Sequence, residues 1–177
     1  ATAAEGDEAP PPDAPPTVFE RCAASELAPA KRAAPIALEA ANMQAFVTNG
    51  DGLDATLREE PGLRVVAAWQ GGALAGFCVA HLARGSNFIY ELHVAPASRR
   101  CGLGCGLLDE VAGVAALQLN VHAANTDALA FYAYAGFTQP ARGRGEWHPE
   151  DGAQAGRWSA PVRVAPPPPR RVPRPPP

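Results

Sequence analysis

The stretch "NFIYELHVAPASRRCGLGCGLLDEV", from Asn87 to Val111, decides the fold. Its first eight residues are rich in aromatic and β-branched side chains, which is typical of a β-strand. Behind the glycines, Leu103, Leu107 and Val111 recur at helical intervals. The turn "RRCGLG" therefore lies at a strand-to-helix junction, where a helix N-terminus offers unpaired N–H groups and a partial positive charge.

The turn from Arg99 to Gly104 has the composition of a phosphate site. Gly102 and Gly104 leave room for a phosphate to approach the backbone, and Arg99 and Arg100 add charge-assisted donors. The phosphate loop of nucleotide hydrolases, Gly-x4-Gly-Lys-Ser/Thr, is absent, and the dinucleotide fingerprint fits loosely because Leu107 stands at its third glycine. A pyrophosphate cradle and a plain glycine-rich helix cap are both compatible with these residues.

The flanking sequence alternates strands with helices. The stretch 63–83 predicts a hairpin around Gln70, Gly71 and Gly72, and 34–47 predicts a helix followed by the turn "TNGDG". Further on, the sequence predicts a strand over 117–121, a helix over 125–137 that ends at Gly136, and a strand over 157–164. The hairpin is antiparallel, whereas the strand-helix-strand passage from Phe88 to Val121 implies a parallel neighbour, so we predict a mixed sheet in an α/β (α+β) fold.

The composition marks one domain with polar ends. The chain has 177 residues, enough for one domain with a hydrophobic core. Residues 1–18 are acidic and Pro-rich, and 165–177 form a Pro/Arg-rich tail, so we expect both segments to be disordered around a domain at 19–164. The tail is either solvated or a ligand for a proline-recognition domain or an acidic partner.

Charge and cysteine content exclude several classes of protein. The formal net charge of -3 indicates no direct nucleic-acid or membrane-surface partner, and no apolar run reaches the roughly 18 residues that span a bilayer. Cys22, Cys78, Cys101 and Cys105 show no disulfide spacing, which favours a reducing, intracellular compartment. The cysteines and histidines also lack metal-ligand spacing, so we expect no metal.

The passage from "FIYELHV" through "RRCGLG" to "AGF" resembles the GNAT superfamily of N-acetyltransferases. In that superfamily a strand, an Arg/Gln-x-x-Gly-x-Gly/Ala turn and a helix bind the pyrophosphate of acetyl-coenzyme A. The match continues at Asn125, Ala128, Phe131, Tyr132, Gly136 and Phe137. The resemblance implies the GNAT fold, in which a mixed, mostly antiparallel sheet is splayed at its central strands and carries helices on both faces. It also implies acetyl-coenzyme A as the acetyl donor.

A narrower resemblance extends from about Phe19 to Arg163. The segments "FERCAASELAP", "ANMQAF", "YELHV" and "RRCGLG" are similar to the N-terminal acetyltransferase D (NatD) family, which acetylates the α-amino group of histones that begin Ser-Gly-Arg-Gly. Three features differ: "VTNGDGLDA" replaces the family's Trp-Gly-Trp, Val47 replaces a Tyr, and the acidic hairpin is shortened to "HLARGSN", with Arg84 where carboxylates bind the substrate arginine.

The NatD resemblance implies an N-α-acetyltransferase in the nucleus and cytoplasm whose partners are protein N-termini, with histone two-A and histone four tails as candidates. Two alternatives stay open. The same fold acts on lysines or small amines in other relatives, and a chain that has lost turnover would be a coenzyme A-binding interaction module.

Three side chains are the catalytic candidates. Glu91 could take the amine proton directly or through a water, although it could also be a surface carboxylate paired with an arginine. Strand alternation points Tyr90 and Glu91 to opposite sides, so both serve one site only if the strand bulges or splays. Tyr132 could protonate the departing thiolate of coenzyme A, or it could be a core aromatic. Asn125 could cap its helix, bind the donor, or do both.

The resemblance also implies the residues that bind the donor. A splayed sheet would leave backbone groups of Leu92 to Val94 for the pantetheine arm and the developing oxyanion. The expected donor-binding residues are Leu92, His93, Val94, Arg99, Arg100, Cys101, Gly102, Leu103, Gly104, Cys105 and Asn125.

Overall fold

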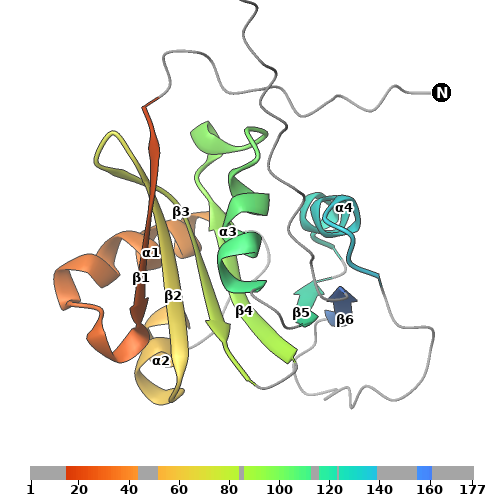
Figure 1. The fold of residues 1–177 in the computed structure, drawn as a ribbon, viewed down its shortest axis with the longest axis horizontal. Helices are drawn as coiled ribbons and strands as arrows, with labels where there is room; N and C mark the ends of the chain where they lie inside the picture. Colours follow the sequence, from red (N-terminus) through yellow and green to blue (C-terminus); the bar gives the residue numbers. More distant parts are fainter. Residues whose placement is uncertain are drawn as a thin grey trace, which may run out of the picture.

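Six strands form one sheet in the order β1-β2-β3-β4-β5-β6 (Figure 1). The structure is a computed structural model that describes residues 15–43, 52–83, 86–112, 116–122, 124–138 and 155–160. The strands are β1 (Thr17–Ala23), β2 (Leu63–Gln70), β3 (Ala73–His81), β4 (Ser86–Val94), β5 (Ala116–His122) and β6 (Ala155–Ala160). Neighbouring strands are antiparallel except β4 and β5, which are parallel. The predicted mixed, mostly antiparallel sheet is confirmed.

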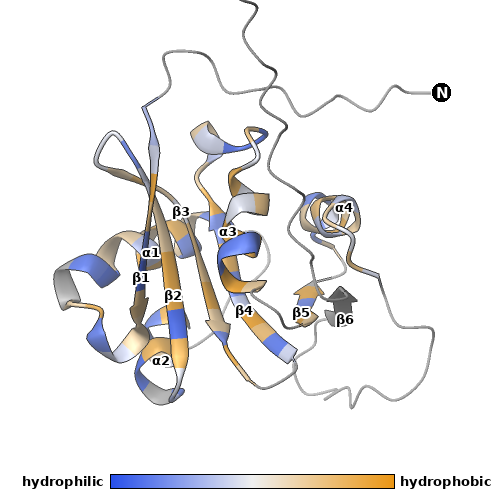
Figure 2. Cartoon of the chain, in the orientation of Figure 1, coloured by the Kyte–Doolittle hydropathy of each residue, from blue (hydrophilic) through white to orange (hydrophobic). Residues whose placement is uncertain are grey.

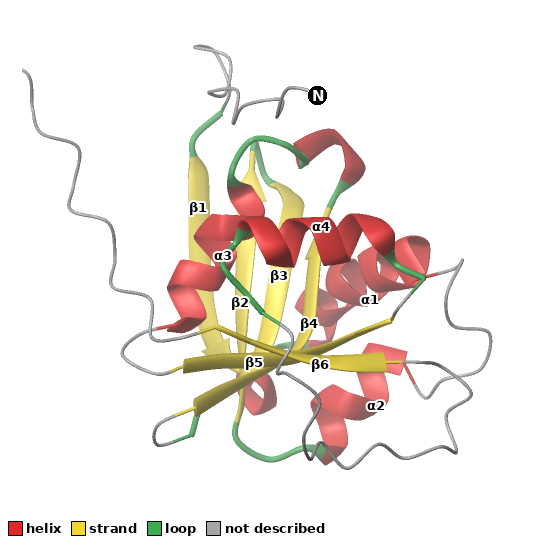
Figure 3. Cartoon of the chain, turned by 90° about the vertical axis from the view of Figure 1, so that its right-hand side faces the viewer, coloured by secondary structure: helices red, strands yellow, loops and turns green. Residues whose placement is uncertain are grey.

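The sheet is splayed between its central strands. β4 pairs with β5 only from Ser86 to Ile89, opposite Ala116 to Leu119, whereas β3 stays paired with β4 up to Val94. Figure 3 shows β5 and β6 lying across the direction of β1 to β4. The part of β4 beyond Ile89 is therefore paired with β3 and not with β5, as the fold prediction required.

Helices cover both faces of the sheet. They are α1 (Pro29–Met43), α2 (Gly52–Glu59), α3 (Leu103–Ala112) and α4 (Thr126–Tyr134), with short 3-10 turns at Ala24–Glu26 and Pro96–Ser98. One hydrophobic cluster joins α3 and α4 to one face, and a second joins α1 and α2 to the opposite face. We call the second face the α1/α2 face. Among the described residues, no helix is long and apolar enough to cross a membrane.

The two central hairpin strands carry the core. Residues 65–68 of β2 and 75–80 of β3 are buried without interruption, because helices cover both of their faces. Figure 2 shows this as hydrophobic colouring along both strands. A buried polar side chain connects the next strand, β4, to helix α3. The Asn87 amide donates to the carbonyl oxygens of Val111 and Ala112 at the end of α3 (2.8 and 3.3 Å).

The first strand and the first helix begin earlier than the sequence predicts. α1 begins at Pro29, five residues before the predicted start at Ala34, because proline is favoured at the first helical position and Pro29 occupies it. Pro35 lies inside the helix and is fully buried, although an internal proline loses a helical hydrogen bond. β1 begins at Thr17, two residues before the domain boundary predicted at Phe19, and that boundary stays a prediction.

Helix α2 was missed entirely. Its sequence follows the "TNGDG" turn, and it presents only Leu53 and Leu57 to the core, too short a pattern for a prediction from periodicity. The last predicted strand corresponds to β6, which begins at Ala155 rather than Arg157. Its predicted end at 161–164 and the predicted disordered segments at 1–14 and 165–177 lie outside the described residues.

Candidate active site

β4 carries a β-bulge at Tyr90. Val79 of β3 lies opposite Glu91, and the next residue, Ala80, lies opposite Ile89, so Tyr90 is the extra residue. A bulge shifts the alternation of side chains by one position. Tyr90 and Glu91 can therefore face the same side of the sheet, which strict alternation does not allow.

Ring and hydrogen-bond contacts place both side chains on the α1/α2 face. The rings of Phe88 and Tyr90 meet edge-on, with centroids 5.2 Å apart. Glu91 Oε2 lies 2.7 Å from His93 Nε2, and the His93 ring stacks on Phe77 at 5.1 Å. Phe77 belongs to the hydrophobic cluster under α1 and α2. The structure thus brings Tyr90 and Glu91 together by the bulge that the sequence argument demanded.

Carboxylates surround this pair. Burial raises the pKa of Glu39 on α1 above its ordinary value, and the negative charge of Glu91 raises it further. Burial and the charge of Glu60 likewise raise the pKa of Tyr90, whose side chain is still 38% exposed. The α1/α2 face at β4 is therefore acidic and accessible, a suitable surrounding for a cationic amine.

Tyr132 lies on the opposite face, where α4 covers the sheet beyond the β4–β5 pairing. Its ring is buried and contacts Phe137, with centroids 5.3 Å apart. Burial raises the pKa of Tyr132 strongly, and the negative charge of Glu91 acts in the same direction. The phenol therefore keeps its proton at neutral pH, and its pKa responds to the charge of Glu91. This position is compatible with either predicted role of Tyr132, the core aromatic or the proton donor.

The turn between β4 and α3 has the backbone shape of an anion site. Arg100 and Gly102 have positive φ angles of 63° and 78° on either side of Cys101, a pattern that turns backbone N–H groups towards one point. The first hydrogen bond of the following helix runs from Gly106 N to Gly102 O at 3.0 Å. Positive φ angles in the turn and the N-terminus of α3 directly after it are the backbone features that suit a pyrophosphate.

The Arg99 side chain contacts α1 and the end of β4, and its predicted role in donor binding stays a prediction. Its Nη2 donates to Asn42 Oδ1 (2.8 Å) and its Nε donates to the Val94 carbonyl (3.2 Å). Asn42 Nδ2 also donates to that carbonyl (3.3 Å), so the Val94 oxygen accepts two side-chain hydrogen bonds, and the predicted contact of the Val94 backbone with the pantetheine arm stays a prediction. Arg100 is the arginine left beside the cradle.

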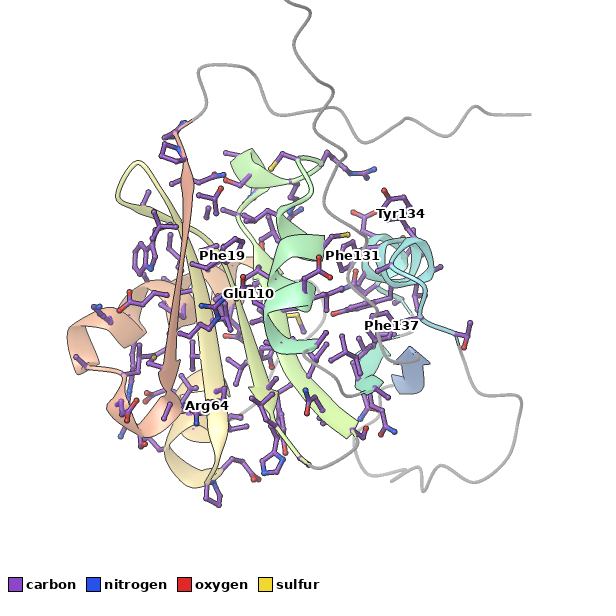
Figure 4. The ribbon with its side chains drawn as sticks, in the orientation of Figure 1. Phe19, Arg64, Glu110, Phe131, Tyr134 and Phe137 are labelled. Atoms are coloured by element: carbon purple, nitrogen blue, oxygen red, sulfur yellow. The ribbon has the colours of Figure 1, made fainter. Side chains whose placement is uncertain are left out.

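Gly104 serves a purpose that the sequence argument did not foresee. A Cβ atom at this position would lie 2.9 Å from two ring carbons of Phe131, so the missing side chain makes room for that ring rather than for a phosphate. Figure 4 shows Phe131 between α4 and α3. Gly104 therefore sets the approach of the two helices, while its N–H group in the first turn of α3 stays a predicted phosphate donor.

We expect Gly104→Ala to destabilise the protein. The new methyl group must displace Phe131, which costs about 1–3 kcal/mol, more than the roughly 0.5–1 kcal/mol that alanine gains in a helix. Thermal unfolding measures the loss. The double variant Gly104→Ala/Phe131→Leu should recover most of it, and strictly additive losses would contradict the steric explanation.

The remaining predicted residues fall as follows. Asn125 caps α4, since its Oδ1 accepts from Ala128 N at 3.1 Å, and a donor-binding role stays a prediction. The side chains of Leu92, Val94 and Cys101 pack against the α3/α4 cluster, and Leu103 is buried in it. Cys101 Sγ also lies 2.9 Å from the Ser98 carbonyl. Cys105 lies in the first turn of α3, partly buried.

Two side chains beside Glu91 were missed as functional residues. Glu39 and Asn42 lie three residues apart on α1 and both interact with the Glu91–His93 pair. Their i, i+3 spacing was visible in "LEAANM", but nothing in the sequence indicates that this helix stripe faces β4. His93 was predicted through its backbone, whereas its side chain makes the contact.

The sequence model of the acetyltransferase (GNAT) family matches residues 31–137, which hold α1, the bulged strand, the cradle and α4. The chain belongs to this family. It is therefore an acetyltransferase whose donor substrate is acetyl-coenzyme A. The bulged β4, its separation from β5 and the backbone cradle fit that donor.

Solved structures share the fold at low identity. The ribosomal-protein-S18-alanine N-acetyltransferase from Escherichia coli is 24% identical, with a TM-score of 0.59 over 84% of this chain and 96% of that chain. Nourseothricin acetyltransferase is 22% identical, with a TM-score of 0.59 over 83% and 99%. The PaiA N-acetyltransferase from Thermoplasma acidophilum, solved with coenzyme A, is 15% identical, with a TM-score of 0.58 over 82% and 98%. No curated protein matches the chain significantly.

Proposed function

We propose that this acetyltransferase is a protein N-α-acetyltransferase, most similar to the NatD family, that acetylates Ser-Gly-Arg-Gly tails of histones two-A and four in the nucleus and cytoplasm. The observation that carries the proposal is the acidic surrounding of Tyr90 and Glu91 on the α1/α2 face. A tail of this kind brings two positive charges, its α-amino group and its arginine, to the acceptor side.

The chemistry of an α-amine suits the groups present. Attack on the thioester needs a neutral amine, and an α-amino group with a pKa of about 7.7–8.0 loses its proton far more readily than a lysine near 10.4. Glu91 is positioned as the base that takes this proton. Tyr132 holds the proton that the departing thiolate needs.

Glu39 and Glu60 supply carboxylates that the shortened hairpin does not. Glu39 and Glu91 repel each other, and a cation between them would relieve that repulsion. The arginine of a Ser-Gly-Arg-Gly tail is such a cation. Glu39 and Glu91 would thus bind the substrate arginine in place of the hairpin carboxylates, where this sequence has Arg84.

A peptide panel tests the proposal. We expect acetyl-coenzyme A-dependent modification of a Ser-Gly-Arg-Gly peptide at its amino terminus, and no product from the same peptide with a blocked terminus and free lysines. Mass spectrometry locates the acetyl group. Turnover on an Ala- or Met-starting peptide with none on Ser-Gly-Arg-Gly would reject the NatD assignment.

We expect Glu39→Gln to raise KM for Ser-Gly-Arg-Gly by about three- to tenfold. This is the effect of losing one partly exposed ion pair between Glu39 and the substrate arginine, which contributes about 1 kcal/mol to binding. KM for Ser-Gly-Ala-Gly, which lacks the arginine, should change by less than about twofold. Steady-state kinetics on both peptides measures the difference. Equal effects on both would show that Glu39 does not bind the arginine.

A second candidate, acetylation of a lysine or a small polyamine-like substrate, has one observation in its favour. The carboxylates at β4 suit any compact dication, and the Trp-Gly-Trp of the NatD family is replaced in this chain. The same panel, extended with a blocked lysine peptide and a diamine, separates the two functions by which amine is acetylated.

A further inference from the structure

A continuous array of side chains runs from the donor turn to Glu91. Arg99 Nη2 donates to Asn42 Oδ1 at 2.8 Å. Asn42 Nδ2 lies 3.4 Å from His93 Nδ1. His93 Nε2 lies 2.7 Å from Glu91 Oε2. The array therefore joins the turn before α3, the helix α1 and the strand β4 at one carboxylate.

The donor and acceptor chemistry of the array allows one arrangement of protons. A guanidinium can only donate, so Asn42 must turn its oxygen towards Arg99 and its NH₂ group towards His93 and the Val94 carbonyl. His93 Nδ1 then accepts, which leaves the ring proton on Nε2, where it is donated to Glu91. A proton on Nδ1 would face the NH₂ group of Asn42.

We propose that His93 is a positioning residue, which holds the Glu91 carboxylate for proton transfer, and that Asn42 and Arg99 fix the His93 tautomer from the donor side. This inference rests on the proposed role of Glu91 as the base, but not on which amine is acetylated. With Oε2 held by His93, Oε1 is the oxygen presented to the acceptor.

The surroundings of His93 suit a fixed group. Its side chain is 6% exposed and its ring stacks on the fully buried Phe77. Among the described residues, Glu39 of α1 is the titratable group that acts on both members of the pair, and Tyr132 of α4 and Cys78 of β3 interact with the charge of Glu91 from the opposite face of the sheet. The His93 carbonyl lies 2.7 Å from where a Cβ of Gly76 would stand, so β3 also leaves the strand no freedom to move there.

Steady-state kinetics of the full chain tests the positioning role. We expect His93→Ala to lower kcat by about tenfold to hundredfold with little change in peptide KM, because a misplaced base loses rate rather than binding. His93→Gln should restore most of kcat, since its amide N–H can donate to Glu91. His81→Gln, at the far end of β3, is the matched control and should leave kcat unchanged. Equal losses in His93→Ala and His93→Gln would overturn the proposal.

A double-variant cycle separates this inference from the role of Glu91. If His93 acts through the carboxylate, Glu91→Gln/His93→Ala should be no slower than Glu91→Gln alone, within about twofold. A further loss equal to that of His93→Ala alone would reject positioning while leaving Glu91 as the base. Wild-type activity in Glu91→Gln would reject both proposals.

Arginine variants test the link to the donor side. Arg99→Ala should lower kcat and also be non-additive with His93→Ala, whereas Arg100→Ala should raise KM for acetyl-coenzyme A and combine additively with His93→Ala. Additive behaviour of Arg99→Ala would show that the array ends at Asn42.

The tautomer provides a readout that does not depend on activity. Nitrogen-15 NMR of the imidazole should show His93 protonated on Nε2 alone in the wild type, and a mixture of tautomers in folded Asn42→Ala. A ring protonated on Nδ1 in the wild type would overturn the proposed array.

Discussion

We expect Glu91→Gln to lower kcat/KM for the preferred amine by about 10²- to 10⁴-fold, the usual contribution of a general base. Glutamine keeps the shape of the side chain and its hydrogen bond with His93 is retained in part, so the fold should be unaffected. What is lost is the group that accepts the amine proton during attack on the thioester. Initial rates with saturating acetyl-coenzyme A measure the effect.

The pH dependence makes this prediction specific. An α-amine with a pKa of about 7.7–8.0 is mostly neutral at pH 9, so the deficit of Glu91→Gln should narrow between pH 7 and pH 9. Asp54→Asn, on the outer side of α2, removes a carboxylate that is paired with Arg58 at the surface and serves as the control. A deficit that stays constant over this pH range would indicate a binding role for Glu91 instead.

We expect Tyr132→Phe to lower kcat by about 100-fold or more, because the thiolate of coenzyme A would leave without a proton donor. Tyr134→Phe is the matched control: it removes the same hydroxyl from the same helix, but Tyr134 is 70% exposed and points outward from α4 (Figure 4). Its activity should equal that of the wild type. Full activity in Tyr132→Phe would leave Tyr132 as a core aromatic only.

The raised pKa of Tyr132 determines how the stability of the folded protein changes at alkaline pH. A phenol whose folded-state pKa lies above the unfolded value of about 10 remains neutral in the folded protein after it has ionised in the unfolded chain. Wild-type stability should therefore hold below about pH 10 and decrease as the pH rises above it. Tyr132→Phe should lack that part of the decrease, which denaturant unfolding at pH 8 and pH 10.5 can measure.

Much of the fold could be predicted because its signals are local. The hairpin around Gln70 to Gly72, the strand that ends at Val94 and the helix that starts at Leu103 each carry their own periodicity or turn residues, and the structure confirms all three. Helix α2 could not be predicted, because two leucines do not make a pattern until another surface buries them.

Candidate site residues could be chosen where they lie close together in sequence, and could not be chosen where they meet only in space. Tyr90, Glu91, Arg100 and Gly102 could be chosen from one continuous stretch. Asn42 reaches His93 across 51 positions of the chain, and Gly104 meets Phe131 across 27, so no spacing rule could find either contact. For the same reason the contact between Arg99 and Asn42 could not be predicted.

The sequence by itself determined the order of the elements and the glycine turn that leads into α3, since these depend on neighbouring residues and backbone freedom, and its resemblance to the GNAT superfamily implied the acetyl donor. Only the tertiary structure decided which side chains share the acceptor face. A single extra residue at Tyr90 reverses the alternation of β4, and the packing of α1 against that strand brings Glu39 and Asn42 to Glu91. Bulge position and helix packing arise from long-range contacts, which a linear pattern does not contain.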